Sequence, residues 1–392
     1  MAIPEPRARH AADGDAVVIE AVADAAAMER FIRAPFALQG GDPNWVPPLS
    51  KERRDHLDPR KNPWFDHAEA GYWLALRGGR VAGRISAQVD RARLARHGDA
   101  TGHFGFLEAE DDGAVFNALF GAAEAWLGER GMRRAMGPFS LSINDETGLL
   151  VDGFDSPPSL MMGHAPPYYG RRVEDQGYVK AMDLFAYTRE TRQPLPPGPT
   201  ALAERVRHSP EVTLRPLDPA RYGDDLDTIL DIFNDAWSEN WGFVPFTAAE
   251  IGHLATSLKP LIRADLVCIA EVGGEPAAMA VALPNLNEAI ADLGGRLLPL
   301  GWARLLWRLK VRGLRTARVP LMGVRRRDHG TPLGAALAFA VVDAIHRHLA
   351  AAGFDQAELS WVLEDNQPMR RMVEAIGGRA YKTYRIYEKA LG

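Results

Sequence analysis

Apolar and polar positions in the first half of the chain follow strand and helix periods in turn. Alternating residues at 70–76 and 80–89 predict two strands joined by the tight-turn dipeptide Gly78-Gly79. Apolar residues at helical spacing over 114–130 then predict a helix that ends at Gly131. The rest of this half is expected to form a strand, a long loop, a short helix and a final strand, at 132–136, 137–168, 169–176 and 178–187.

The same order of elements recurs in the second half. The patterns predict strands at 266–272, 277–283, 318–324, 356–363 and 380–387, with helices at 333–352 and 368–376. A recurring order indicates an internal repeat. Because strands alternate with helices, we expect an α/β fold of two similar domains, each a mixed central sheet flanked by helices.

The clearest break lies between these halves, where residues 193–199 contain four prolines. Proline disrupts helix interiors and central strands, so we expect neither a helix nor a strand at 192–200. The predicted domains are therefore 1–192 and 211–392, joined by a linker at 193–210.

Composition narrows the class of protein. The 392 residues are 46% hydrophobic and 25% charged, as in globular proteins, and the length favours two cores. A net charge of −5 gives no overall attraction to nucleic acid or anionic lipid. A single cysteine, Cys268, fits a reducing compartment, and residues 1–15 lack an apolar signal core. We expect a cytoplasmic protein, with peripheral contact to the inner face of the cell membrane left open.

A possible anion site follows the strand at 318–324. There the chain passes from Val324 through three arginines, Arg325, Arg326 and Arg327, to a helix start containing Gly330, Thr331 and Gly334. Small residues let backbone N–H groups approach a phosphate, and the helix N-terminus adds a positive partial charge. The arginines are expected to supply counter-charge.

This order of strand, loop and helix resembles the GNAT acyltransferase superfamily, which implies splayed central strands and an acyl-CoA donor whose diphosphate sits on this loop. The superfamily pattern is Q/R-x-x-G-x-G/A, and Arg327 and Gly330 match it, whereas Pro332 replaces the second small residue. Asn366 matches the asparagine that opens the next helix. Val373 stands where many members carry the tyrosine that protonates the departing thiolate.

At the level of the whole chain, the sequence resembles the bacterial tandem-GNAT family to which ceramide synthases belong. The resemblance is carried by residues 42–49, 137–146, 237–243 and 358–366. It implies an N-acyltransferase that joins a long-chain acyl group from acyl-CoA to a sphingoid-type amine.

Three residues are candidates for proton transfer. Glu364 ends a strand and is a possible base for the acceptor amine, while His329 lies in the phosphate-binding loop itself. Tyr384 is the candidate substitute for the missing acid. For each of them a structural role is the alternative: a helix start, a solvated loop and strand packing.

Aromatic residues point to an acceptor site. Trp237, Asn240, Trp241 and Phe243 either wall this site or fill a core. Trp302, a further substrate-binding candidate, lies in a segment at 296–318 that combines basic residues with leucine and tryptophan. Such a segment suits an anionic bilayer surface, and a helix docked on the protein explains the pattern equally well. Few aromatics alternate with the charges, so no nucleic-acid partner is expected.

The first half departs from the superfamily pattern. Where the phosphate loop belongs, residues 106–112 carry four carboxylates, which suit helix capping and repel a diphosphate. Asn144, Asp145 and Glu146 form a polar cluster that tight turns explain about as well as a binding site does. No set of cysteines and histidines has zinc spacing, so no metal is expected.

Two other functions remain open. A non-catalytic acyl-CoA or lipid-binding protein would keep the fold and bind without turnover. A tRNA-dependent aminoacyl transferase would bind RNA with a steep dependence on salt.

Overall fold

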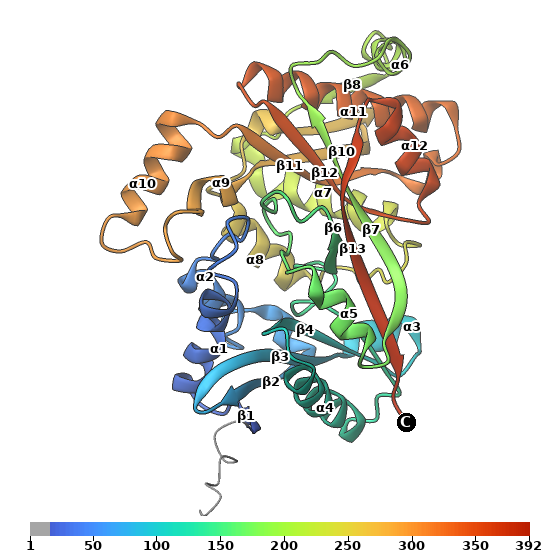
Figure 1. Cartoon of the computed structure of the whole chain (residues 1–392). Coiled ribbons are helices and arrows are strands. Elements are labelled where there is room, and N and C mark those ends of the chain that lie inside the picture. Colours follow the sequence, from blue (N-terminus) through green and yellow to red (C-terminus); the bar gives the residue numbers. More distant parts are fainter. Residues whose placement is uncertain (1–15) are drawn as a thin grey trace, which may run out of the picture.

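The computed structural model describes residues 16–392 and joins both halves through one continuous sheet (Figure 1). Within these residues, thirteen strands pair in the order β1-β2-β3-β4-β5-β13-β7-β12-β11-β10-β9-β8, with β6 attached to β13. The strands of the first half are β1 (Val17–Ala21), β2 (Ala68–Arg77), β3 (Arg80–Asp90), β4 (Thr101–Ala109), β5 (Arg134–Gly137), β6 (Leu149–Asp152) and β7 (Val179–Glu190). Those of the second half are β8 (Val212–Arg215), β9 (Val267–Val272), β10 (Glu275–Pro284), β11 (Thr316–Val324), β12 (Gln356–Leu363) and β13 (Arg379–Ala390).

Helices cover the faces of this sheet. The first half contains α1 (Ala25–Leu38), α2 (Ser50–His56), α3 (Arg91–His97), α4 (Gly113–Glu129) and α5 (Tyr168–Glu174). The second half contains α6 (Pro197–Arg207), α7 (Tyr222–Ala236), α8 (Ala248–Leu258), α9 (Leu286–Ile290), α10 (Gly301–Trp307), α11 (Pro332–Ala351) and α12 (Gln367–Ala375).

The two halves exchange their last strands. β7, which ends the first half, pairs with β12 of the second half, and β13, which ends the chain, pairs with β5 of the first half. β7 and β13 also pair with each other along most of their length. Figure 1 shows them as long neighbouring strands that run from the end of the molecule holding β2–β4 to the end holding α6 and α12.

The predicted elements of both halves are present within a few residues of their expected bounds. The expected loop at 137–168 is wrong in one place, because it contains the short strand β6, which pairs with β13. The expectation of no helix at 192–200 is also wrong. Helix α6 begins at Pro197 with proline in its first turn, where a missing N–H costs nothing.

Alternating residues of β10 show how the second half is layered. Ala278, Ala280 and Ala282 face a core that includes residues of α11. Met279, Val281 and Leu283 face the other core, which includes residues of α7. Small residues under α11 let this long helix lie close to the sheet.

Helix α11 is, among the described helices, the one long and apolar enough to cross a membrane. Its apolar residues pack in the core instead: Leu337, Ala340 and Val341 are fully buried. Burial against the sheet accounts for its apolar composition.

Candidate functional site

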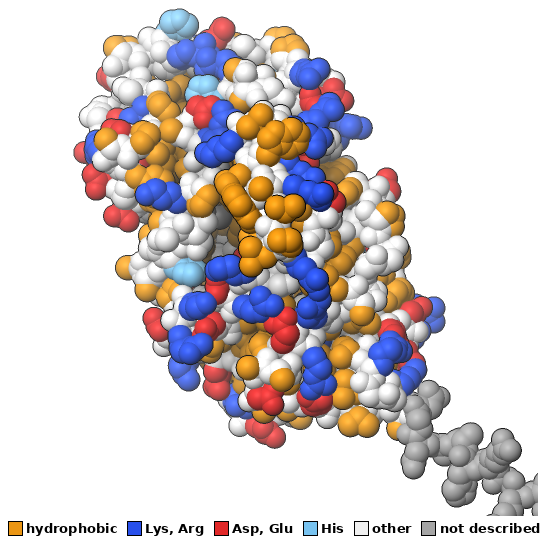
Figure 2. Space-filling model, turned by 90° about the vertical axis from the view of Figure 1, so that its left-hand side faces the viewer, with side chains coloured by type: hydrophobic (Ala, Val, Ile, Leu, Met, Phe, Trp, Pro, Cys, Tyr) orange, Lys and Arg blue, Asp and Glu red, His pale blue; other side chains and the backbone are white. Residues whose placement is uncertain are grey.

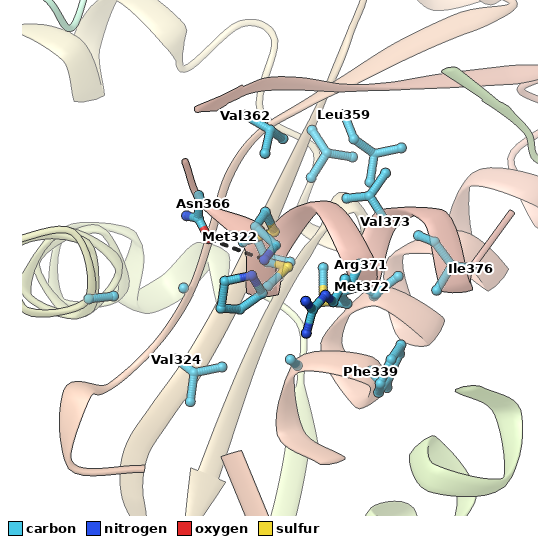
Figure 3. Close-up of a pocket in the computed structure, with 18 of the residues that line it drawn as sticks. Met322, Val324, Phe339, Leu359, Val362, Asn366, Arg371, Met372, Val373 and Ile376 are labelled. Carbon is cyan, nitrogen blue, oxygen red and sulfur yellow. Dashed lines mark hydrogen bonds between the residues drawn. The ribbon is translucent and has the colours of Figure 1, made fainter. Parts of the chain in front are cut away.

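The central strands of the second half part from each other. β11 and β12 are parallel but pair only from Thr316 opposite Gln356 to Val319 opposite Leu359. Beyond this point they splay, and a cavity of about 1100 Å³ opens between them. Figure 3 shows side chains such as Met322 of β11, Val362 of β12, Phe339 of α11 and Met372 of α12 around this space. We refer to it as the donor cavity.

The loop between β11 and α11 forms one wall of the donor cavity. The Thr331 hydroxyl caps α11 by accepting a hydrogen bond from the Gly334 N–H at 2.9 Å. A Cβ on Gly334 would overlap the Asp328 carbonyl oxygen, so only glycine fits there without a shift of the loop. Gly330 has φ of +71° and donates no backbone hydrogen bond within the described chain. Its N–H is therefore available to an anion at the positive end of α11.

These positions match the predicted donor-binding set in part. Val324, Gly330, Thr331, Gly334 and Asn366 all line the donor cavity. The Asn366 side chain also caps α12, since its Oδ1 accepts from the Met369 N–H at 3.1 Å. Five of the predicted residues are thus brought together by the fold.

The three loop arginines lie outside the cavity wall. Arg325 donates to the Pro276 carbonyl at 2.7 Å and forms an ion pair with Asp231. Arg326 forms an ion pair with Glu239, and Arg327 lies 3.5 Å from Asp328. The three arginines were expected to supply counter-charge to a bound anion, but their charges are paired with acidic side chains of the protein.

A cation that sequence reasoning missed does line the donor cavity. Arg371 of α12 is exposed and stands close to apolar lining side chains such as Met372 and Phe339 (Figure 3). The sequence does contain a signal for this arginine. In the helix that starts at Asn366, Arg371 lies two residues before the buried Val373 and therefore on a different face.

The three candidates for proton transfer are dispersed. His329 lines the donor cavity and donates from Nε2 to the Val324 carbonyl at 2.7 Å. Glu364 forms an ion pair with Lys180 at 2.6 Å, and is not among the residues that line this cavity. Tyr384 is fully buried in the core of the first half, where burial raises the pKa of its hydroxyl well above the ordinary value.

The aromatic acceptor candidates also separate into groups. Trp237, Asn240 and Trp241 line the donor cavity, and Trp237 Nε1 donates to the Met322 carbonyl at 3.1 Å. Phe243 is buried in the core beside α7. Trp302 is 50% exposed on the surface and lines no described cavity.

A buried polar cluster lies where β11 and β12 begin to part. Arg318 donates to the Ser360 hydroxyl at 2.9 Å and to the Leu160 carbonyl at 2.7 Å. The Glu358 carboxylate accepts from the hydroxyls of Ser360 and Tyr381. Burial lowers the pKa of Arg318, although the Glu358 charge opposes the shift. Sequence reasoning missed this cluster, because a charge within an apolar strand does not indicate which residue of another strand it meets.

The polar cluster ties the two halves together at the site. Leu160 belongs to the first half of the chain and Tyr381 packs against the core of that half, whereas Arg318, Glu358 and Ser360 belong to the splayed strands. Because a buried charge must be fully hydrogen-bonded to be tolerated, this cluster holds the strands in register at the point where they part.

Comparison with known proteins places the chain in a family. No family model matches it. The bacterial ceramide synthase of Caulobacter vibrioides is 52% identical over 367 residues, which cover 93% of this chain and 95% of that protein. Protein YghO of Escherichia coli is 47% identical over 365 residues, 93% of each chain.

Solved structures agree on the fold. A tandem GNAT protein from the clavulanic acid biosynthesis pathway superposes with a TM-score of 0.56 at 15% identity, covering 96% of this chain and 99% of that one. A GCN5-related N-acetyltransferase from Sphaerobacter thermophilus gives 0.53 at 15% identity, covering 96% of both. These likenesses confirm the predicted tandem α/β fold. Taken with the identity over nearly the full length, they show that the chain belongs to the family of tandem-GNAT N-acyltransferases that contains bacterial ceramide synthase.

Proposed function

We propose that this protein transfers a long-chain acyl group from acyl-CoA to the amine of a sphingoid-type lipid. The observation that carries the proposal is the donor cavity, which opens between splayed strands and ends at the Gly330 N–H, free within the described chain. The Caulobacter vibrioides relative, a bacterial ceramide synthase, supports the class of acceptor.

The residues present fit an acyl-CoA. An N–H at a helix N-terminus suits a diphosphate, and the exposed Arg371 suits a further phosphate group. The walls between them are apolar, as a pantetheine arm and acyl chain require. When bound, the thioester supplies an activated acyl carbon, and the protein contributes mainly position and exclusion of water.

An acceptor that is a sphingoid-type lipid would reach the protein from a membrane. Leu298, Leu300, Trp302, Leu306, Trp307 and Val311 are each exposed by 49% or more. Figure 2 shows a cluster of hydrophobic side chains flanked by Lys and Arg on the face that α10 occupies in Figure 1. We refer to residues 296–312 as the apolar insertion.

The charges of the apolar insertion favour an anionic bilayer surface. Arg296, Arg304, Lys310 and Arg312 are exposed, and none of them forms an ion pair with another described residue. Each such residue adds about 1 kcal/mol of attraction to an anionic membrane. Arg318, which the sequence pattern grouped with them, is instead buried in the polar cluster.

The transfer is tested by incubating the purified protein with palmitoyl-CoA and sphinganine. We expect free thiol to appear together with the N-acyl product, measured by a thiol reagent and by mass spectrometry. Ethanolamine, an amine without a long chain, is the matched control and should give at most a small release. Binding of palmitoyl-CoA without release in the presence of any amine would contradict the proposal and favour a non-catalytic binding protein.

The membrane contact is tested by co-sedimentation with phosphatidylglycerol vesicles. Val311→Ser should weaken binding severalfold, because a 71% exposed side chain loses its contact with the bilayer. Val179→Ser makes the same change at a 62% exposed residue outside the insertion and should have no effect. Equal binding of both variants, or equal binding to phosphatidylcholine, would count against the contact.

A further inference from the structure

A second cavity, of about 660 Å³, lies between the two halves on the side of the apolar insertion. We refer to it as the acceptor cavity. Its walls come from α2, the end of β4 and residues 138–148 of the first half, and from α8 and α9 of the second. Polar side chains such as His56 and Asp145 and apolar side chains such as Leu286 and Ile290 both line it, as an amphipathic ligand requires. We refer to these two sets as its polar and apolar walls.

The polar wall carries a histidine–carboxylate pair. His56, at the end of α2, places Nε2 3.3 Å from Asp145 Oδ1. Asp145 Oδ2 accepts from the Ser142 hydroxyl at 3.0 Å, which orients the carboxylate. The neighbouring carboxylates have other partners, since Glu146 pairs with Arg53 and Glu108 pairs with Arg84. Asp145 is thus the carboxylate left to His56, whose other ring nitrogen, Nδ1, lies 3.5 Å from Arg53 Nη1.

The electrostatics of this pair suit proton transfer. Burial by itself would lower the pKa of His56, but the charge of Asp145 outweighs it and raises the pKa above the ordinary value. Glu52 adds to this rise and Arg53 opposes it. The charge of Asp145 thus stabilises the protonated imidazole that forms when His56 accepts a proton.

A second histidine in the same wall lacks a partner on one ring nitrogen. The His164 side chain is 2% exposed, and its Nε2 lies 2.8 Å from Asp42 Oδ2. Because the carboxylate accepts, Nε2 carries a proton, and Nδ1 is the ring atom that is left for another partner. Within the described chain Nδ1 makes no hydrogen bond. A buried polar atom without a partner is costly, so a hydroxyl or ammonium of a ligand is expected to donate to it.

The apolar wall leads to the surface. Leu254, Leu286, Ile290 and Leu297 line the acceptor cavity. Leu297 lies at the start of the apolar insertion, next to Leu298, which is 79% exposed. A hydrocarbon chain in this wall therefore has a continuous apolar path toward the face that we assign to the membrane.

A small apolar cavity of about 110 Å³ adjoins both larger cavities. Asn144, Asp145 and Met161 line it together with the acceptor cavity. Trp237, Ser360 and Trp361 line it together with the donor cavity. The small cavity thus lies between Asp145 and the gap between β11 and β12.

We propose that the acceptor cavity binds a long-chain amino-alcohol or amino-ketone, with its amine beside the His56–Asp145 pair and its hydrocarbon chain along Leu286, Ile290 and Leu297. The acceptor enters as an ammonium ion; His56 takes one proton from it, and the nitrogen loses a second proton to solvent as it is acylated. The amine nitrogen bonds to the acyl carbon as the carbon–sulfur bond breaks. The sulfur leaves with the electron pair, and the proton held by His56 returns through solvent to give a free thiol. This site rests on the proposed acyl transfer.

Kinetics of a histidine variant test the site. His56→Gln keeps similar volume without the base, and should lower kcat/KM for sphinganine about 100-fold or more while palmitoyl-CoA affinity is unchanged. The loss should shrink at high pH, where the amine releases its proton unaided. His208→Gln, at an exposed position after α6, is the matched control and should leave the kinetics unchanged.

A second variant keeps the test decisive if His56→Gln does not fold. Leu286→Trp fills the apolar wall and should weaken binding of sphinganine at least tenfold, measured by displacement of a fluorescent lipid. Wild-type kinetics in His56→Gln, with unchanged sphinganine binding in Leu286→Trp, would overturn the site and leave the transferase standing. Sphinganine binding that depends on Leu286, without thiol release, would overturn the transferase and leave the lipid site.

Discussion

The gap between the two central parallel strands is open in the second half of the molecule and closed in the first. In the second half, β11 and β12 pair over four residues and then part around the donor cavity. In the first half, β4 and β5 pair from Thr101 to His103, and the chain then folds back across the gap. The Phe139 N–H donates to the Phe104 carbonyl at 2.8 Å, and a Cβ on Gly105 would overlap the Phe139 carbonyl oxygen.

The helices that begin beside the two gaps also differ in the charge at their N-termini. α11 begins with a neutral Thr331 cap and the free Gly330 N–H. α4 begins with an Asp112 cap, after Glu110 and Asp111, which pair with Arg80 and Arg172. Negative charge already neutralises the positive end of α4, so a diphosphate gains little there. One copy of the repeat therefore has an open gap beside an uncharged helix start, while the other has a closed gap beside an acidic one.

The largest expected effect tests whether the two halves unfold independently of each other. Ile386 of β13 is fully buried in the core of the first half. Ile386→Ala should lower the free energy of unfolding by about 2–5 kcal/mol, because it leaves a cavity in that core. Since β13 also pairs with β7, the loss should reach the second half, as seen in a single shifted transition in denaturant.

Cys268 of β9 reports on the second half in the same experiment. Burial raises the pKa of its thiol to about 12, so the native protein should react slowly with a thiol reagent at pH 8. Ile386→Ala should speed this labelling at intermediate denaturant. Unchanged labelling of Cys268, with a destabilised first half, would show that the halves open separately.

The next effect sharpens the comparison of the helix starts. Gly334→Ala forces a Cβ onto the Asp328 carbonyl oxygen and displaces the loop, whereas Gly113→Ala on α4 meets only the flexible end of Arg172 at 3.4 Å. We expect Gly334→Ala to weaken palmitoyl-CoA binding about tenfold, or about 1.4 kcal/mol, by calorimetry. Gly113→Ala should leave binding unchanged. Equal losses in both variants would mean that both helix starts bind the donor.

The smallest effect compares the two helix caps. Thr331→Ala and Asp112→Ala each remove a side-chain cap, and each should cost about 1 kcal/mol of stability in denaturant unfolding. Only Thr331→Ala should also raise KM for the acyl-CoA. A raised KM in Asp112→Ala would contradict the closed state of the first gap.

Much of the fold followed from local pattern. Alternation predicted β2 and β3, helical spacing predicted α4 and α11, and the recurrence of one order predicted the tandem fold. The pairing of β13 with β5 could not be predicted in this way. Alternation of apolar and polar residues shows which face of a strand is buried, but it does not show which distant strand pairs with it.

In the site, too, residues that are close in sequence could be predicted to lie together, whereas residues that are far apart could not. Gly330, Thr331 and Gly334 are neighbours in sequence, so local pattern was enough to predict that they share one loop, and this loop lines the donor cavity. Tyr384 alternates properly within its strand, but the exchange of strands buries it in the other half. His56 and Asp145 are 89 positions apart, so no local spacing could bring them together.

The exchanged strand has a consequence for biosynthesis. A ribosome releases the chain from its N-terminus, yet β13, the neighbour of β5, spans Arg379–Ala390, far downstream of β5 at Arg134–Gly137. This edge of β5 therefore stays unpaired until β13 has been made. Nascent chains and products that stop early expose this edge to other chains, which makes them substrates for chaperones and proteases.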